Sequence, residues 1–389
     1  MTFKLLANTP MGLERVVASE IESLGYETTL ENGRVFFEGD SEAIIRTNLM
    51  MRTADRIRII IGDFEAKTFD ELFEQTKALP WSDILGPGAE FPVTGRSHKS
   101  TLYSVPDVQR IVKKAVVEHL RNEFSIKGRL PESGPRYKID VSIHKDRALL
   151  TIDTSGPALH RRGYRTGQGE APIKETLAAS MLKLANYDGT KPLIDPFAGS
   201  GTIVIEAAMI ALNIAPGSNR TFDAEKWDII PQEKWHRVRM ELEDAALYDK
   251  EVEIYASDID EHMIQIARDN AMEVGLDGNI HFEVMDVHDL SIREKAVQMV
   301  TNPPYGERIG EAKAVEDMYR TIGKLMKSNP TLSVYVMTSN KEFEHIVGKR
   351  RQNAESCSTV ISRRHSSNTG ESGLKTEWSI HRHWRYFTN

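Results

Sequence analysis

The first 63 residues alternate between short apolar runs and a stretch with apolar residues at helical spacing. In residues 11–24, Leu13, Val17 and Ile21 lie about one turn apart, and Gly25 follows as a terminating residue. This alternation predicts a small ferredoxin-like α+β domain, which by itself indicates no activity. The expected strands cover residues 5–7, 35–37 and 56–61, and the expected helices cover residues 11–24 and 42–49.

Residues 64–155 continue the pattern with two helices and a pair of alternating strands. We expect a helix over residues 69–79, a second helix that begins at 104–107 with Pro106 in its first turn, and strands over 137–143 and 148–153. Basic side chains lie on the polar loop before the second helix and on the helix itself. They are open to two interpretations, a solvated face or contacts to RNA phosphates. These residues are Arg96, Lys99, Arg110, Lys113 and Lys114.

From about residue 171 to residue 350, four strand-like apolar runs each end in a polar turn. The first run ends at Asp195 before a glycine-bearing turn, and the second ends at Asp258. The third ends at Asp286, and the fourth precedes residues 302–305. In a parallel sheet, all four turns would converge on the edge where open α/β folds bind ligands. Residues 213–250 are too long for a minimal connection, so we expect extra helical structure near the mouth of this site.

The acidic residues at these turns suit a cofactor that carries an amino acid and a nucleoside. Asp195 precedes the glycines and would fit an ammonium better than a phosphate, and no Gly-Lys-Ser/Thr follows. Asp258 or Asp260 can accept ribose hydroxyls, although Asp260 also fits a plain helix cap. Asp286 could hold an adenine amino group with Val287 against the ring, or it could be an ordinary turn residue.

The fourth turn, Asn302-Pro303-Pro304-Tyr305, has the chemistry needed to methylate an exocyclic amine on a planar ring. Such a nitrogen is a poor nucleophile because its lone pair is delocalised. The Asn302 side-chain oxygen and the Pro303 carbonyl could each accept one N–H bond and favour a pyramidal nitrogen. The prolines stiffen the turn, and Tyr305 offers a face for an unstacked base. The alternative is a polar turn with an exposed aromatic residue.

The composition limits which cellular compartment and which kinds of site the chain can have. The chain has 389 residues, a net charge of −7 and one cysteine, Cys357. A single cysteine excludes an internal disulfide and a cysteine zinc cluster, and fits a reducing cytoplasm. No apolar run approaches the ~20 residues of a membrane span, and the N-terminus lacks the form of a signal peptide. No His/Asp cluster suggests a metal, so none is expected.

These motifs carry a specific resemblance. Residues 64–153 resemble a THUMP domain, an RNA-binding module, and residues from about 160 onward resemble a class I S-adenosylmethionine-dependent methyltransferase. The order of His-Arg-Arg-Gly-Tyr-Arg, DPFAGSGT, SDID and NPPYGER, over residues 3–349, resembles the THUMP-domain guanine-N2 methyltransferases of 23S ribosomal RNA. The resemblance implies a Rossmann-like α/β catalytic domain after the α+β region, and a guanine flipped into the fourth turn.

The resemblance also implies roles for individual residues. S-adenosylmethionine would contact Asp195, Phe197, Ala198, Gly199, Gly201, Thr202, Asp258, Ile259, Asp260, Asp286, Val287 and Asn302. The target base would contact Asn302, Pro303, Pro304 and Tyr305. RNA would contact the five basic residues above and the linker residues His160, Arg161, Arg162 and Arg165, which could instead pack between domains. Lys174 and Glu175 are further candidates near the methionine end of the cofactor.

The expected domain divisions are a ferredoxin-like domain 1–63, a THUMP domain 64–155, a basic linker 156–170, a catalytic domain 171–350 and a tail 351–389.

The tail departs from the resemblance. Residues 332–337 predict a late strand, but the chain from residue 352 to residue 378 is polar and shows almost no strand pattern. The basic Lys-Leu-Tyr/Phe-Asn-Gly phrase usual in the family is absent. Our hypothesis is that the reading frame is shifted from about Arg351, so that an edge strand is missing. Sequencing the gene tests this hypothesis, because an intact frame shared by close relatives would refute it.

Three other functions remain open from the sequence. An adenine-N6 methyltransferase on nucleic acid would use the same fourth turn, as would a protein-glutamine methyltransferase. The THUMP-like region favours RNA over both DNA and protein substrates. The third is an RNA-binding or assembly factor with weakened catalysis. The unusual tail favours this function, whereas the intact DPFAGSGT and NPPY motifs argue against it.

Overall fold

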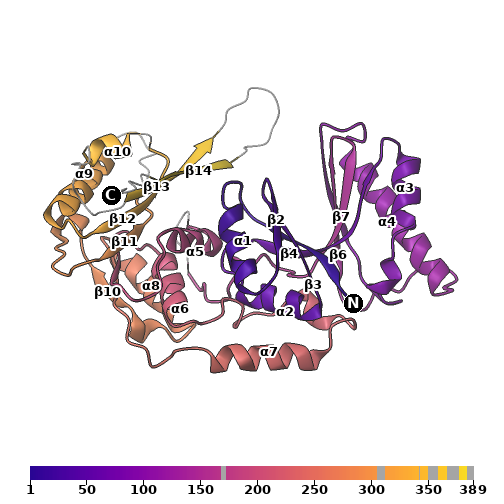
Figure 1. Ribbon diagram of the computed structural model, residues 1–389, viewed down its shortest axis with the longest axis horizontal. Coiled ribbons are helices and arrows are strands. Elements are labelled where there is room, and N and C mark those ends of the chain that lie inside the picture. The colour runs from indigo at the N-terminus through magenta and orange to yellow at the C-terminus, as the bar shows by residue number, and fades with distance from the viewer. Residues whose placement is uncertain (168–171, 305–311, 341, 349–357, 366–375, 383–389) are drawn as a thin grey trace, which may run out of the picture. The chain divides into compact units, whose positions relative to one another are not determined.

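The computed structural model describes residues 1–167, 172–304, 312–340, 342–348, 358–365 and 376–382 (Figure 1). The chain divides into two compact units. Unit 1 contains residues 1–9, 17–159 and 220–241, and unit 2 contains residues 10–16, 160–219 and 242–389. Among the described residues, no helix is long and apolar enough to cross a membrane.

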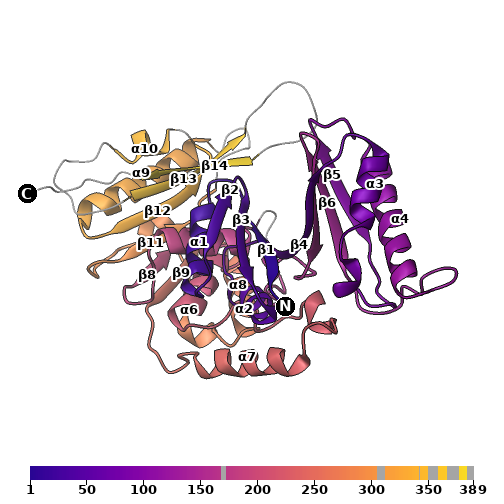
Figure 2. The same cartoon turned by 45° about the vertical axis from the view of Figure 1, so that its right-hand side comes forward.

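Unit 1 is built on one seven-stranded sheet in the order β2-β3-β1-β4-β7-β6-β5 (Figure 2). Every neighbouring pair is antiparallel except β5 and β6, which are parallel. The predicted division at residue 63 therefore falls inside β4, a strand that joins the two halves of the sheet. The strands are β1 Phe3–Asn8, β2 Thr28–Glu31, β3 Arg34–Gly39, β4 Arg56–Glu65, β5 Val93–His98, β6 Lys138–His144 and β7 Arg147–Asp153.

Two glycines mark where helices of unit 1 pack closely on this sheet. A Cβ added to Gly39 would meet Ala43 of α2, and one added to Gly95 would meet Gln109 of α4 and the buried Val141. Local signals agree with the helix boundaries, because Asp40 caps α2 and Pro106 lies in the first turn of α4. The helices are α1 Glu14–Ser23, α2 Ser41–Met50, α3 Phe69–Lys77, η1 Trp81–Asp83 and α4 Val105–Glu123.

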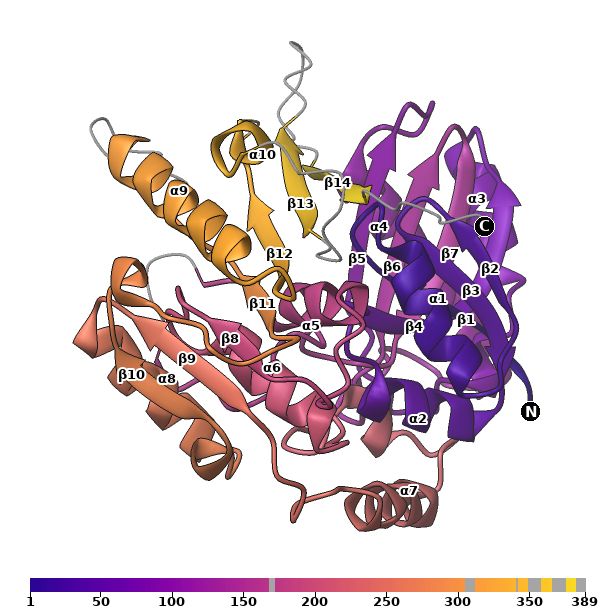
Figure 3. The same cartoon turned by 60° about the vertical axis from the view of Figure 1, so that its left-hand side comes forward.

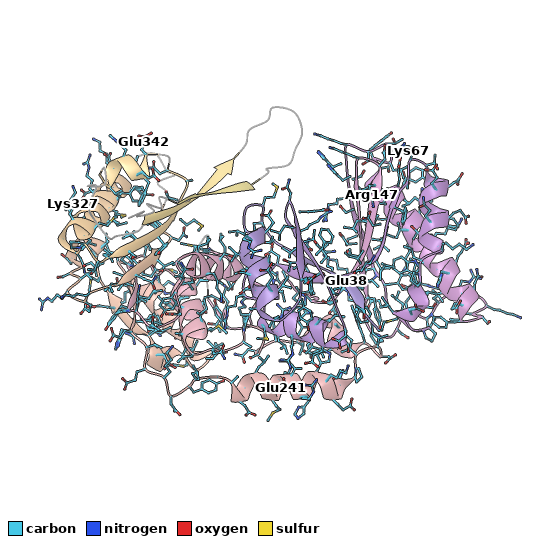
Figure 4. All side chains as sticks on the ribbon, viewed as in Figure 1. Glu38, Lys67, Arg147, Glu241, Lys327 and Glu342 are labelled. Carbon is cyan, nitrogen blue, oxygen red and sulfur yellow. The ribbon has the colours of Figure 1, made fainter. Side chains whose placement is uncertain are left out.

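The segment inserted between β8 and β9 is helical, as predicted, but residues 220–241 belong to unit 1. Its helix α7, Gln232–Asp244, carries Glu241 (Figure 4). Two ion pairs of 2.5 Å join α7 to α2, one between Arg237 and Glu42 and one between Arg46 and Glu241. These residues thus pair with helix α2 of unit 1, and their expected place near the mouth of the site stays a prediction. Sequence spacing could not reveal this, since the paired residues are 195 positions apart.

Unit 2 contains a second seven-stranded sheet in the order β10-β9-β8-β11-β12-β13-β14 (Figure 3). All its neighbouring strands are parallel except the pair β13 and β14. The chain leaves β8 towards β9 and later returns on its other side with β11, so a topological switch point lies between β8 and β11. The strands are β8 Leu193–Asp195, β9 Ile254–Asp258, β10 His281–Val284, β11 Gln298–Thr301, β12 Ser333–Thr338, β13 Ser358–His365 and β14 Thr376–Arg382.

Apolar side chains cover both faces of this sheet, as expected of a parallel arrangement. Neighbouring residues Leu193 and Ile194 of β8 belong to different buried clusters. The first cluster includes α5, α6 and α8, and the second includes α9 and Phe343 of α10. The helices are α5 Glu175–Leu184, α6 Thr202–Ala211, α8 Glu261–Met272, α9 Ala312–Ser328 and α10 Phe343–Ile346, with short turns η2 Asp223–Lys226, η3 Asp277–Asn279 and η4 Val287–Asp289. The predicted α/β class is confirmed.

The expectation that the tail lacks strands is wrong. Strand β13 pairs in parallel with β12, and β14 pairs antiparallel with β13. The polar composition hid a short run of β-branched residues, Thr359, Val360 and Ile361, which favours a strand. The reading-frame hypothesis is a separate matter and stays a prediction about the gene.

Candidate active site

Hydrogen bonds link all four predicted turns at the carboxyl edge of the unit 2 sheet. The Thr301 hydroxyl at the end of β11 donates to the Asp195 carboxylate at the end of β8, with 2.6 Å between the oxygens. The backbone N–H of Gly199 in the glycine turn donates to Asp258 at the end of β9 over 2.9 Å. The turn after β10 is tied in by a backbone bond from Met285 to Asp258. The sheet therefore brings the predicted motifs to one edge.

Asp195 is a buried carboxylate that is only partly satisfied. It is 1% exposed, and its Oδ1 accepts bonds from Thr301 and from the backbone N–H of Phe197. Its Oδ2 is buried and has no hydrogen-bond partner among the described residues. Burial raises the pKa of Asp195 from 3.8 to about 7, against the opposing effect of these two hydrogen bonds. An oxygen in this state fits a cationic ligand group such as the ammonium of an amino acid.

The glycine turn has the conformation that its sequence predicts. Gly199 and Gly201 have φ values of 53° and 79°, a region that favours glycine. A Cβ on Gly201 would lie 2.9 Å from the Cβ of Ala267, whereas one on Gly199 would meet nothing within 4 Å. Gly201 is thus required by helix packing, while Gly199 leaves open space beside the strand ends. Ala198 and Thr202 are buried and Phe197 is half-buried.

The linker before the catalytic domain holds this turn in place. Arg165 donates to the hydroxyls of Ser200 and Thr202 at 3.3 and 3.1 Å, and pairs with Glu175 at 2.9 Å. Burial raises the pKa of Glu175, and Arg165 opposes that rise. The fully buried Asn270 also holds the linker against the glycine turn. Its side-chain amide donates hydrogen bonds to the backbone carbonyls of Gly167 and Ser200. Lys174, next to Glu175, is exposed.

The side chains of Arg162 and Arg165, predicted to contact RNA, form ion pairs within unit 2 instead. Arg162 is 2% exposed and forms a buried ion pair with Glu206 of α6, with 3.1 Å between Nε and Oε1. A buried guanidinium that is already paired is not free to neutralise a phosphate. The alternative offered by the sequence was packing between domains, whereas both arginines pair with residues of their own unit, Glu206 and Glu175. Arg161 is exposed and His160 is half-buried, and their predicted role stays untested.

The end of β9 combines a carboxylate with an apolar side chain. Each oxygen of Asp258 accepts one backbone N–H, from Gly199 and from Asp260, which leaves further lone pairs for hydroxyl donors. Asp260 caps α8 by accepting from the backbone of His262. Ile259 between them is 66% exposed and offers an apolar surface beside the carboxylate.

One carboxylate oxygen of Asp286, which follows β10, is hydrogen-bonded to a histidine. Its Oδ1 lies 2.6 Å from Nδ1 of His288, whose Nε2 lies 3.0 Å from Asp317 of α9. The hydrogen bonds from His288 lower the pKa of Asp286, and Asp286 in turn raises the pKa of His288. Val287 is 4% exposed, so its side chain packs within the protein in this structure, unlike the exposed Ile259.

The fourth turn follows β11 directly. Asn302 is half-buried and Pro304 is exposed, while Tyr305 lies outside the described residues. The fully buried Tyr319 of α9 fixes the turn from behind, because its hydroxyl bonds the Pro304 carbonyl at 3.4 Å and Thr338 of β12 at 3.0 Å. Burial raises the pKa of Tyr319, which keeps the phenol neutral and able to donate.

The five basic candidates in unit 1 differ in how they are paired. Lys113 pairs with Glu132 at 2.6 Å and lies 3.6 Å from the centroid of the Phe91 ring, so it contacts its own protein, an arrangement that neither interpretation anticipated. Arg110 is largely exposed but pairs with Asp107. Lys99 and Lys114 are exposed, and Arg96 is 55% exposed on β5. The last three are accessible to a ligand.

Sequence reasoning missed four residues that organise the site: Thr301, Asn270, Tyr319 and the Glu206 partner of Arg162. None belongs to a recognisable motif, because each acts through a hydrogen bond to a distant segment. Of the four, only Glu206 gave a signal in the sequence, because it is a charged residue within the otherwise apolar helix α6. A charge in such a position predicts a buried partner of opposite charge.

Comparison with known proteins places these features in a family. Family models match residues 4–58 as an RlmL ferredoxin-like domain, residues 66–153 as a THUMP domain and residues 162–366 as an RMKL-like methyltransferase domain. YpsC of Bacillus subtilis (strain 168), a candidate RNA methyltransferase, is 52% identical over 349 residues, which are 90% of this chain and 91% of YpsC.

Two crystal structures are similar over nearly the whole chain. One is of a predicted N6-adenine-specific DNA methylase from Listeria monocytogenes str. 4b F2365, with 51% identity, a TM-score of 0.87 and coverage of 91% of this chain and 93% of that one. The other is of SMU.472, a candidate methyltransferase complexed with SAH, with 40% identity, a TM-score of 0.88 and 99% coverage of both chains. With these matches and the arrangement of its strand-end motifs, the chain belongs to the THUMP-containing, RlmL-type family of methyltransferases.

Proposed function

We propose that this protein is an S-adenosylmethionine-dependent RNA methyltransferase that methylates N2 of a guanine in 23S ribosomal RNA, in the cytoplasm. The observation that carries the proposal is the link between two turns. Thr301, the residue before Asn302, bonds Asp195, so the base-side turn is fixed to the cofactor-side carboxylate by one hydrogen bond of 2.6 Å. Such a link would keep an acceptor site for an amine next to a site for a cation.

The described residues fit S-adenosylmethionine at three points. The buried, unpartnered Oδ2 of Asp195 would accept its ammonium, the remaining lone pairs of Asp258 would accept its ribose hydroxyls, and exposed Ile259 would pack on its adenine. Bound there, the cofactor supplies a methyl group on a positively charged sulfur. In the transfer the carbon–sulfur bond would break with its electron pair staying on sulfur, a carbon–nitrogen bond would form, and the proton lost by the amine would pass to water.

The protein's contribution to this step is positioning and hydrogen bonding. Asn302 and the Pro303 carbonyl would accept the two N–H groups of the exocyclic amine, which orients its lone pair towards the methyl carbon. Tyr319 stiffens the turn by holding the Pro304 carbonyl. A base must leave its stack to reach such a turn, so the substrate base would be flipped or already unpaired.

The choice of RNA rests on the family match to a THUMP domain over residues 66–153 and on the description of YpsC as a candidate RNA methyltransferase. The choice of guanine N2 in 23S RNA rests on the RlmL-type matches. Adenine N6 is the second candidate, favoured by the description of the similar Listeria structure. The amine chemistry of the fourth turn is the same in both cases.

Identification of the methylated nucleoside tests the proposal. Purified protein is incubated with methyl-labelled S-adenosylmethionine and ribosomal RNA that lacks the modification, and the digested RNA is analysed by mass spectrometry. N2-methylguanosine in 23S RNA supports the proposal, N6-methyladenosine selects the second candidate, and cofactor binding without transfer to any RNA refutes both. Transfer to 16S RNA alone would refute the assignment to 23S RNA.

A further inference from the structure

A histidine joins the turn after β10 to helix α9. His288 of η4 lies between two carboxylates, with Nδ1 2.6 Å from Oδ1 of Asp286 and Nε2 3.0 Å from Oδ2 of Asp317. Asp286 is two positions away along the chain, whereas Asp317 is 29 positions away. Both ring nitrogens therefore face an acceptor, and the contact to Asp317 is a tertiary link between η4 and α9.

The two contacts together require the charged form of the ring. A neutral imidazole carries one N–H group and one lone pair, so it can donate to only one of two carboxylates. Its other nitrogen would then point a lone pair at a carboxylate oxygen, and the two would repel each other. An imidazolium donates to both carboxylates, and the short 2.6 Å distance to Asp286 is expected of a hydrogen bond between charged groups.

The charges around the ring favour that form. The hydrogen bond to Asp286 raises the pKa of His288 from 6.5, desolvation opposes the rise, and the hydrogen bond to Asp317 adds to it. The hydrogen bonds from His288 lower the pKa of Asp286, which is therefore ionised at neutral pH. Arg320, one turn further along α9, pairs with Glu316 at 2.5 Å. The other charged side chains of η4 and α9 are Asp289, Lys313, Lys324 and Lys327.

The partners of His288 lie beside two parts of the candidate site. Its backbone N–H and its Nδ1 both bond Oδ1 of Asp286, which leaves the lone pairs of Oδ2 for an N–H donor from outside the protein. The exocyclic amine of an adenine is such a donor. At the other end, Asp317 lies two positions before Tyr319, whose hydroxyl bonds the Pro304 carbonyl. Helix α9 thus carries both a partner of His288 and the support of the fourth turn.

We propose that His288, as an imidazolium, is a positioning residue that orients Asp286 towards the adenine of the cofactor and ties this turn to α9. The proposal rests on the proposed function for the cofactor, and it adds a contact from Asp286 to the adenine amino group. Neutralising the ring would release Asp317 and loosen Asp286, while every group that contacts the rest of the cofactor would stay in place.

The expected pH dependence has a definite sign. The pKa of His288 lies above 6.5 in the folded protein, so the link to Asp317 is complete below 6.5 and is lost as the pH rises through the folded value. The contribution of His288 to cofactor affinity should follow the same curve. This contribution decreases with rising pH, whereas ionisation of a carboxylate that binds an ammonium would increase affinity.

The first test follows the ring itself by nuclear magnetic resonance of the full-length protein with labelled histidine. The His288 signal is assigned by its loss in His288→Gln. We expect a titration midpoint above 6.5, and a lower midpoint in Asp317→Asn, which lacks one of the two charged acceptors. Saturating S-adenosylmethionine should move the wild-type midpoint upwards, because a ligand that binds the charged form better must favour that form in return.

The second test measures the affinity for S-adenosylmethionine by calorimetry between about pH 6 and about pH 9. Every variant keeps Asp195, so the ratio of wild-type to variant affinity isolates His288. His288→Gln should bind about fivefold more weakly than wild type at the acidic end, which is the upper limit for a partly exposed ion pair, and should approach wild type at the alkaline end. The control His236→Gln, at an exposed position on α7, should match wild type throughout, and circular dichroism checks that each variant folds.

An affinity ratio between wild type and His288→Gln that stays constant with pH would overturn the proposal, because a histidine with a merely structural role gives the same loss at every pH. A titration midpoint that S-adenosylmethionine does not move would also overturn it. Failure of the wild type to bind S-adenosylmethionine would refute the proposed function and this role together. Methylation of a base other than guanine would refute the proposed function alone, since neither test involves RNA.

Discussion

Replacing Asp195 with Asn should make the protein more stable at alkaline pH in the absence of cofactor. Burial raises the pKa of Asp195 to about 7, from 3.8 when the group is freely solvated. Folding therefore favours the protonated form. The stability that this group contributes is complete below pH 3.8 and is lost as the pH rises towards about 7, because the unfolded chain ionises first. Asn cannot ionise, so the variant escapes this loss.

The magnitude follows from the distance between the two pKa values. Each pKa unit corresponds to about 1.4 kcal/mol, so the wild-type protein should lose about 3 kcal/mol relative to Asp195→Asn between about pH 5 and pH 8. Any difference in packing between the amide and the carboxyl group does not depend on pH. The difference between the two stabilities at two pH values therefore isolates the ionisation.

Urea denaturation of both proteins across this pH range measures the difference. Asp249→Asn, at an exposed loop position of the same unit, serves as the control and should follow the wild type at every pH. The same Asp195→Asn variant should lose S-adenosylmethionine binding in calorimetry, because it lacks the negative oxygen. The contribution of Asp195 to wild-type affinity for the cofactor should rise with pH up to about 7 and then level off.

A constant stability difference across this pH range would refute the reasoning. It would mean that Asp195 ionises normally in the folded protein, and that its buried Oδ2 is satisfied by a group that neutralises the burial cost. Retention of cofactor binding in the variant would separately refute the assignment of the ammonium to this oxygen.

Three further predictions concern residues that hold the site together. Arg162→Met should destabilise the protein by about 3–5 kcal/mol in urea denaturation, since it leaves the Glu206 charge buried, and Arg162→Met/Glu206→Met should recover most of that loss. Tyr319→Phe should lower the rate of methyl transfer about tenfold without changing cofactor affinity, because the Pro304 carbonyl loses its donor; an unchanged rate would show that the turn needs no such support. Asn270→Ala should weaken cofactor binding about tenfold and cost about 1–3 kcal/mol of stability, and calorimetry that finds full affinity would exclude its role in fixing the glycine turn.

Periodic patterns and motifs in the sequence predicted much of the catalytic unit. Asp195, Asp258 and Asn302 were expected at strand ends, and parallel strand order places their segments on one edge of the sheet. The capping role of Asp260 was one of two alternatives considered, and the structure shows that Asp260 caps α8. The predicted positions at strand ends agree with the structure because each depends on local sequence and on a general rule about sheets, whereas the cofactor contacts of these residues stay predictions.

What the sequence did not reveal has a common physical origin in long-range pairing. Arg162 and Arg165 were predicted to bind RNA, and no pattern in the sequence indicated that their partners are Glu206 and Glu175. His288 was not considered, because its bond to Asp317 joins segments 29 positions apart. Pairing of this kind leaves no periodic trace in the sequence.

The central claim is tested most directly by methyl transfer to unmodified 23S RNA with wild-type protein and with Asn302→Ala in parallel, under saturating labelled S-adenosylmethionine. Calorimetry shows whether each protein binds the cofactor, and Asn122→Ala, exposed on α4, serves as the control. The account predicts N2-methylguanosine from the wild type and the control, and a drop in transfer of about a thousandfold in Asn302→Ala with cofactor binding retained. Transfer at the wild-type rate by Asn302→Ala would contradict the account.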